Sequence, residues 1–127
     1  MTSRLSLFLD VSTEIGVVKG AITEVLGHSF SVIESDMGTI YATTAFCIEW
    51  RLFEDHGLED DCGIAFSQYR YQLMLTPLRH GAAESFFEAM YNSCAAFMAA
   101  TISTSLACRT LIVANLQRQV AAFVHIA

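Results

Sequence analysis

Apolar and polar residues alternate along several short segments of the chain, and two helical stretches interrupt them. In the first segment, Leu5–Val11, the leucines fall on one face with a period of two, as in a strand. Apolar residues at helical spacing follow from Ile15, and Gly27 stands where a left-handed residue ends a helix. Further strands are predicted at residues 28–34, 39–44 and 46–52. The last two are either separate strands with a bend at Ala45 or one long strand.

The second half of the chain contains a strand, a long helix and another strand. Residues 63–75 are predicted to form one long strand with a bulge near Ser67, because the apolar residues change parity there. A long helix begins at Ala82, and Phe97 is among the apolar residues that keep its period. Residues 110–113 are predicted to be a buried strand, and the tail after them forms either a strand or a short helix.

The resulting order is β-α-β-β-β-β-α-β, followed by the tail. Adjacent strands flanked by helices are typical of the α+β class, here a mostly antiparallel sheet with two principal helices packed on it. A length of 127 residues suits one domain, so we expect a single globular domain over residues 1–127. The hydrophobic fraction of 54% and the charged fraction of 16% exclude a disordered chain.

Two features of the sequence predict the compartment. Residues 1–10 lack the basic region and the long apolar run of a signal peptide, and the four cysteines stand at scattered positions. We therefore expect a cytoplasmic protein with reduced thiols. Residues 89–108 carry no charge over the length of a membrane span, but polar residues crowd them. We expect a buried helix there and no membrane partner.

Acidic residues outnumber basic ones by 13 to 7, which gives a formal net charge of −6. The acids all lie in residues 1–88, so the remainder of the chain, residues 89–127, is weakly basic. This balance argues against binding of a nucleic-acid backbone, which needs clustered cations. Five of the acids gather in one predicted loop: Glu54, Asp55, Glu59, Asp60 and Asp61. Such a cluster is either a solvated loop or a site for a cationic protein, and its spacing does not fit a calcium-binding loop.

Other chemistry is sparse. The chain has no G-x-S-x-G, no G-x-G-x-x-G and no phosphate-binding loop. His56 and Cys62 flank the acidic loop, but no paired ligands complete a zinc site. We therefore expect no catalytic residue, no cofactor, no metal and no enzymatic activity. Trp50 and Tyr41 lie on predicted strands near the loop, where they are either aromatic anchors for a partner or ordinary packing residues.

The acidic segment Glu54–Asp61 and the ending T-L-I-V-A-N-L-Q-R-Q-V after a long apolar helix carry a resemblance. With its size and α+β order, the chain resembles the small acidic immunity proteins of bacterial contact-dependent growth inhibition and related polymorphic toxin systems. The resemblance is one of type rather than of aligned residues. It implies a cytoplasmic protein that binds and neutralises one cognate toxin domain, often a nuclease. A nuclease is cationic where it holds phosphates, so an acidic surface would mimic its substrate.

Two other functions stay open at this point. One is a small α+β ligand-binding domain or enzyme, which would have a concave pocket with converging polar groups between helix and sheet. The other is a self-associating structural protein, which the low charge and the apolar residues 82–127 favour. The expected partners are thus the cognate toxin domain and, under the last alternative, a second copy of the chain in a homodimer.

Overall fold

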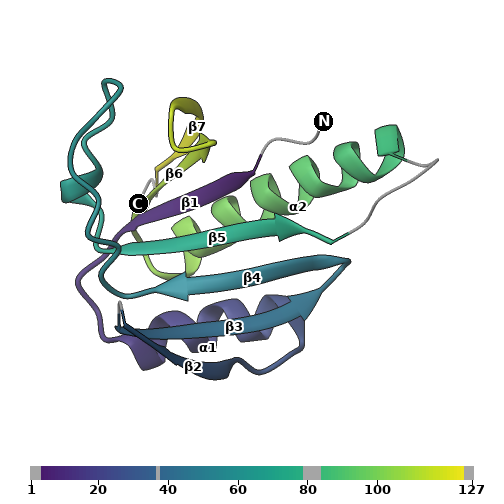
Figure 1. Ribbon diagram of the computed structural model, residues 1–127, viewed down its shortest axis with the longest axis horizontal. Coiled ribbons are helices and arrows are strands. Elements are labelled where there is room, and N and C mark those ends of the chain that lie inside the picture. Colours follow the sequence, from purple (N-terminus) through teal and green to yellow (C-terminus); the bar gives the residue numbers. More distant parts are fainter. Residues whose placement is uncertain (1–3, 37, 79–83, 125–127) are drawn as a thin grey trace.

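The computed structural model describes residues 4–36, 38–78 and 84–124. They form seven strands, two α-helices and one turn of 3₁₀ helix (Figure 1). The helical elements are α1 (Ile15–Leu26), η1 (Phe66–Gln68) and α2 (Glu84–Ser105). The strands are β1 (Leu5–Asp10), β2 (Ser31–Ser35), β3 (Gly38–Ala45), β4 (Ile48–Phe53), β5 (Tyr71–Pro77), β6 (Arg109–Ala114) and β7 (Arg118–Phe123).

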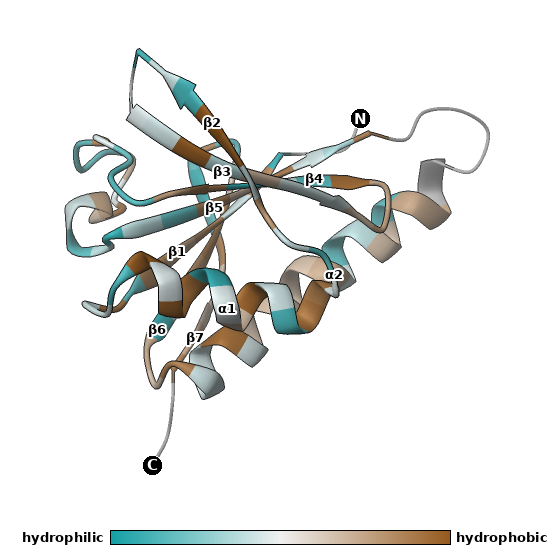
Figure 2. Cartoon of the chain, turned by 90° about the horizontal axis from the view of Figure 1, so that it is seen from below, coloured by the Kyte–Doolittle hydropathy of each residue, from teal (hydrophilic) through white to brown (hydrophobic). Residues whose placement is uncertain are grey.

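All seven strands belong to one antiparallel sheet in the order β2-β3-β4-β5-β1-β6-β7. Although β1 comes first in the chain, it lies inside the sheet, where Leu7 is paired with Leu73 on one side and Ile112 on the other. Both helices lie on the same face of the sheet (Figure 2). This two-layer arrangement confirms the predicted α+β class and, in outline, the predicted order of elements.

The main core lies between the sheet and the two helices, and the alternation along the strands builds it. In β4, Ile48, Trp50 and Leu52 face the helices and are almost fully buried. The helices bury their own apolar stripes against these and the matching residues of β1 and β5: Val18, Ile22, Leu26, Phe87, Tyr91, Ala95, Met98, Ala99 and Ile102. Each buried large apolar side chain stabilises the fold by about 1.5–3 kcal/mol.

Tyr91 joins α2 to the sheet through two hydrogen bonds. Its buried hydroxyl accepts a hydrogen bond from the backbone N–H of Leu5 at 2.8 Å and donates one to the carbonyl of Leu75 at 2.7 Å. Leu5 and Leu75 are register partners in β1 and β5, so one phenol bridges the ends of two neighbouring strands. Burial raises the pKa of Tyr91 to about 12.

A tight turn separates β3 from β4, which settles the alternative left open at Ala45 in favour of two strands. Phe46 and Cys47 have φ values of 59° and 60°, and Ala45 pairs with Ile48. Two successive left-handed residues are typical of a type I′ hairpin turn, in which Asn-Gly is the preferred dipeptide. The turn leaves 56% of the Phe46 surface exposed.

The prediction of one long strand over residues 63–75 is wrong. Strand β5 begins only at Tyr71, and the residues before it form a turn and η1. A continuous strand would place Tyr69 and Tyr71 on one face, yet they belong to different apolar clusters. The change in parity therefore marks a segment that has left the sheet rather than a bulge within it.

The C-terminal tail forms strand β7 as far as Phe123, which settles the second alternative. β7 pairs with β6, and the register shifts between Ile112 and Val113. The four cysteines are free thiols, as the sequence predicts. Within the described residues, no helix combines the length and the hydropathy that a membrane span requires.

Candidate functional site

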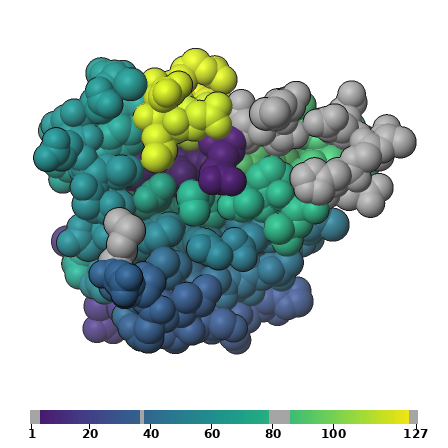
Figure 3. All heavy atoms as spheres, viewed as in Figure 1, coloured from purple at the N-terminus to yellow at the C-terminus, as the bar shows by residue number. Residues whose placement is uncertain are grey.

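Between β4 and β5 the chain leaves the sheet through residues 54–70, which we call the β4–β5 connection. Its first part, residues 54–61, is the acidic loop of the sequence. The connection projects from one end of the sheet (Figure 1) and lies beside β7 in the space-filling view (Figure 3). The predicted acidic residues are therefore gathered at one end of the molecule.

A second apolar cluster holds the connection against the face of the sheet that the helices leave free. Residues of β1 and β6 that alternate with the main core point to this face. The cluster consists of Phe8, Leu111 and Val113 from the sheet and Ile64, Phe66 and Tyr69 from the connection. All six are buried, and the ring centroids of Phe8 and Phe66 lie 4.9 Å apart. The connection is thus packed against the sheet by its second half.

His56 ties the two arms of the connection together. Its Nε2 lies 2.6 Å from the carbonyl oxygen of Tyr69, and its Nδ1 lies 2.9 Å from the backbone nitrogen of Leu58. A carbonyl can only accept and a backbone N–H can only donate, so Nε2 carries the proton and Nδ1 is the acceptor. The ring also packs edge-on against Phe8, with centroids 5.4 Å apart. The imidazole therefore bridges the acidic loop, the second half of the connection (residues 62–70, which we call the return arm) and the sheet.

Three carboxylates of the acidic loop are oriented by backbone N–H groups of the same connection. Asp55 accepts from Gly57 at 3.1 Å, Asp60 accepts from Ser67 at 2.9 Å, and Asp61 accepts from Cys62 at 2.8 Å. The backbone N–H and the hydroxyl of Ser67 hold the pKa of Asp60 below its ordinary value. The acidic loop is thus fixed in shape and ionised at Asp60 under neutral conditions.

Most of the loop's negative charge faces solvent and forms no salt bridge with a cation of the described residues. Asp55, Glu59, Asp60 and Asp61 are exposed, and within the described residues none of them makes a salt bridge. Glu54 differs, because it is half-buried and pairs with Arg70 at 2.8 Å. The structure therefore brings all five predicted acids together but neutralises one of them.

The prediction that Trp50 is an aromatic anchor for a partner is wrong. Trp50 is 1% exposed, and its indole N–H donates to the carbonyl of Ala45 at 3.1 Å. Tyr41 is half-buried on the same face of the sheet, with the Lys19 ammonium 4.2 Å from its ring centroid. Both side chains point toward the helices, whereas the connection packs on the opposite face. Neither aromatic residue is therefore part of the acidic surface.

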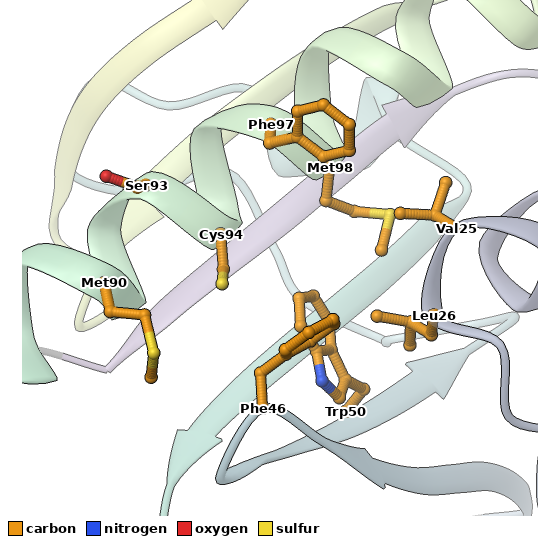
Figure 4. A pocket seen from close by; sticks show the side chains of 9 residues that line it. All are labelled: Val25, Leu26, Phe46, Trp50, Met90, Ser93, Cys94, Phe97 and Met98. Carbon is orange, nitrogen blue, oxygen red and sulfur yellow. The ribbon is translucent and has the colours of Figure 1, made fainter.

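Sequence reasoning also missed a cavity at the other end of β4. About 290 Å³ in volume, it lies between α1, α2 and the β3–β4 hairpin (Figure 4). Phe97 was predicted to belong to the buried face of the helix, but 64% of its surface is exposed, and it lies at the rim of this cavity. The sequence held one signal of this cavity: Phe46 and Cys47 stand at the turn between two strands, where small or polar residues are usual.

No protein-family model matches the chain, and the curated proteins and solved structures contain no significant match to it. The geometry of the two sites thus carries the functional argument.

Proposed function

We propose that the protein is a non-enzymatic inhibitor, of the immunity-protein type, that binds a cationic toxin domain through its acidic loop. One observation carries this proposal: Asp55, Glu59, Asp60 and Asp61 are all exposed on an anchored connection with no salt bridge to a described cation. Like charges held so close repel one another, and an approaching cationic surface removes that repulsion.

The anchoring of the connection supports a role in recognition. A loop that must be ordered on binding loses conformational entropy at that moment, which weakens the complex. Here the His56 bridge and the apolar cluster under the return arm order the loop beforehand. Three of the carboxylates are also oriented by backbone N–H groups, so their charges have fixed positions. The acidic loop is therefore preorganised for a partner of fixed shape.

The chemistry of a nuclease toxin matches this surface. Such a domain holds phosphates with Lys and Arg, so a rigid row of carboxylates can occupy the same cationic groups. Opposite charges of this kind increase the association rate and select the partner. Glu54 contributes less than the other four acids, because Arg70 already neutralises it.

The direct test is co-production with the product of the adjacent upstream gene, which this proposal expects to carry the toxin domain. We expect the chain to protect growth and to co-purify with that domain at low salt. A variant with Asp55→Asn, Glu59→Gln, Asp60→Asn and Asp61→Asn keeps the hydrogen-bond acceptors and should lose protection. Failure of the native chain to bind that domain, or full protection by the variant, would contradict the proposal.

A further inference from the structure

The cavity beside the β3–β4 hairpin is open to solvent on one side and is lined by three elements that meet only in the folded chain. Figure 4 shows Val25 and Leu26 of α1 on one side and Met90 and Cys94 of α2 on the other, with Trp50 of β4 below them. Its volume is about 290 Å³. An engineered apolar cavity of about 150 Å³ is enough to hold benzene. The cavity therefore has room for one or two fused rings.

The lining offers apolar contact and almost no polar chemistry. Among the described residues no charged side chain lines the cavity, and the hydroxyl of Ser93 points away from the other lining side chains (Figure 4). The indole N–H of Trp50 is already bonded to the Ala45 carbonyl. Burial raises the pKa of the Cys94 thiol, which keeps it protonated and neutral. A charged ligand would lose its hydration here and gain no partner in return.

Aromatic and thioether groups dominate the remaining surface. Phe46, Trp50 and Phe97 supply three rings, and Met90 and Met98 supply two sulfur atoms. Aromatic rings gain from offset or edge-to-face contact with other rings, and methionine sulfur gains from contact with a ring. These contacts favour a flat ring over a flexible aliphatic chain, which also loses more conformational freedom on binding.

The backbone at Phe46 provides a separate observation. Phe46 and Cys47 adopt left-handed φ values that side chains with a Cβ disfavour, and more than half of the Phe46 surface stays exposed. The type I′ turn accounts for these φ values, but it does not account for an exposed phenylalanine at a position where Asn is preferred. The effect of the turn is to hold the Phe46 ring at the mouth of the cavity beside Trp50 (Figure 4).

We propose that this cavity binds a small uncharged aromatic compound of one or two rings, with Phe46 and Phe97 at its mouth. The site lies at the opposite end of β4 from the acidic loop, so it goes beyond the proposed toxin binding and does not depend on it. A small α+β ligand-binding domain was the alternative function that the sequence left open. The cavity lies between helices and sheet, as that alternative expects, but its lining is apolar rather than polar.

The chain has a single tryptophan, and it lines the cavity. The indole N–H resonance of Trp50 in the folded, ¹⁵N-labelled protein therefore reports on occupancy, since an unlabelled ligand adds no signal to it. Titration with free indole should shift this resonance in a saturable manner. Indoleacetate tests charge, and n-octanol tests an aliphatic molecule of similar size. Both should bind at least about tenfold more weakly than indole.

Two variants of the turn separate the role of the ring from that of the backbone. Phe46→Asn suits the left-handed turn but removes the ring, so it should fold and weaken indole binding by about tenfold. Cys47→Gly relaxes the same turn and should leave binding unchanged. Phe86→Asn controls for loss of an exposed phenylalanine, since Phe86 is 75% exposed on α2 outside the cavity. An unshifted Trp50 resonance, equal binding of n-octanol, or unchanged binding by Phe46→Asn would overturn the proposal.

Discussion

The imidazole of His56 donates a hydrogen bond of 2.6 Å to the carbonyl oxygen of Tyr69 and so joins the start of the β4–β5 connection to its end. Its other nitrogen accepts from the N–H of Leu58. This bridge, together with the packing of the return arm, turns a run of carboxylates into a surface of fixed shape.

Replacement of His56 by phenylalanine should loosen the acidic loop. The ring can still pack on Phe8, but the carbonyl of Tyr69 and the N–H of Leu58 lose their partner. We expect a loss of about 1–2 kcal/mol in the free energy of unfolding and faster hydrogen exchange at the Leu58 amide. His28→Phe, at an exposed histidine outside the connection, is the control. Unchanged exchange at Leu58 would show that the bridge does not order the loop.

The hydroxyl of Tyr91 should contribute measurably to stability. Tyr91→Phe leaves the Leu5 N–H and the Leu75 carbonyl without their partner in a buried site. Because each such group costs about 1–3 kcal/mol, we expect a loss of about 2–4 kcal/mol in urea unfolding. Tyr69→Phe is the matched control, since within the described residues the Tyr69 hydroxyl makes no hydrogen bond. A similar loss in both variants would contradict the role assigned to Tyr91.

The same phenol should make the fold sensitive to alkali. The pKa of Tyr91 is about 12 in the folded protein against an ordinary value of 10.0, so the unfolded chain releases this proton first as the pH rises. The contribution is complete below pH 10 and is lost progressively between pH 10 and 12. Burial raises the pKa of Tyr71 as well. Tyr71 therefore adds to the loss of stability at alkaline pH, and its contribution remains in a Tyr91→Phe variant.

The alkaline effect can be assigned to Tyr91 by comparing the free energy of unfolding at neutral pH and at about pH 11. The native chain should lose about 1 kcal/mol more than Tyr91→Phe over this interval, since each unit of pKa shift corresponds to 1.36 kcal/mol. An equal loss in the two proteins would mean that another group is responsible.

Replacing Cys47 in the β3–β4 turn by glycine should increase the free energy of unfolding. Cys47→Gly removes a Cβ from a residue with a φ of 60°, and we expect a gain of about 0.5–1 kcal/mol in thermal or urea unfolding. Gly27→Ala is the opposite case. Gly27 ends α1 with a φ of 73°, and an added Cβ would meet no atom within 4 Å, so its loss of about 1 kcal/mol would come from backbone strain alone. Destabilisation by Cys47→Gly would show that the turn is not strained.

Much of the sheet could be predicted because burial on one face imposes a period of two. Ile48, Trp50 and Leu52 show this clearly, since all three are buried and the residues between them are not. Residues 63–75 misled the prediction because Ile64, Phe66 and Tyr69 bury themselves under a folded connection rather than in a strand. Apolar residues need burial in either case, and their pattern does not say which backbone provides it.

The candidate site could be predicted only in part. The acidic loop was visible because its carboxylates are close in sequence, but the bridge from His56 to Tyr69 spans the whole connection. Trp50 was misplaced because it is close to the acidic loop in the sequence, whereas its alternation with Ile48 and Leu52 places its side chain on the apolar face of β4. The sequence could not show that Cys94 and Phe46 line the same cavity, because this depends on how α2 and the β3–β4 hairpin are placed in the fold.

The central claim is that local negative charge, rather than net charge, attracts the partner. Its most direct test is the association rate constant, at low and high salt, with the toxin domain that the proposal expects the adjacent upstream gene to encode. The control neutralises four exposed carboxylates elsewhere, Glu14, Glu24, Glu34 and Asp36, so its net charge equals that of the variant neutralised at Asp55, Glu59, Asp60 and Asp61. The account predicts that the loop variant associates at least about tenfold more slowly at low salt, while the control stays near the native rate. Equal slowing of both variants, or of neither, would contradict it.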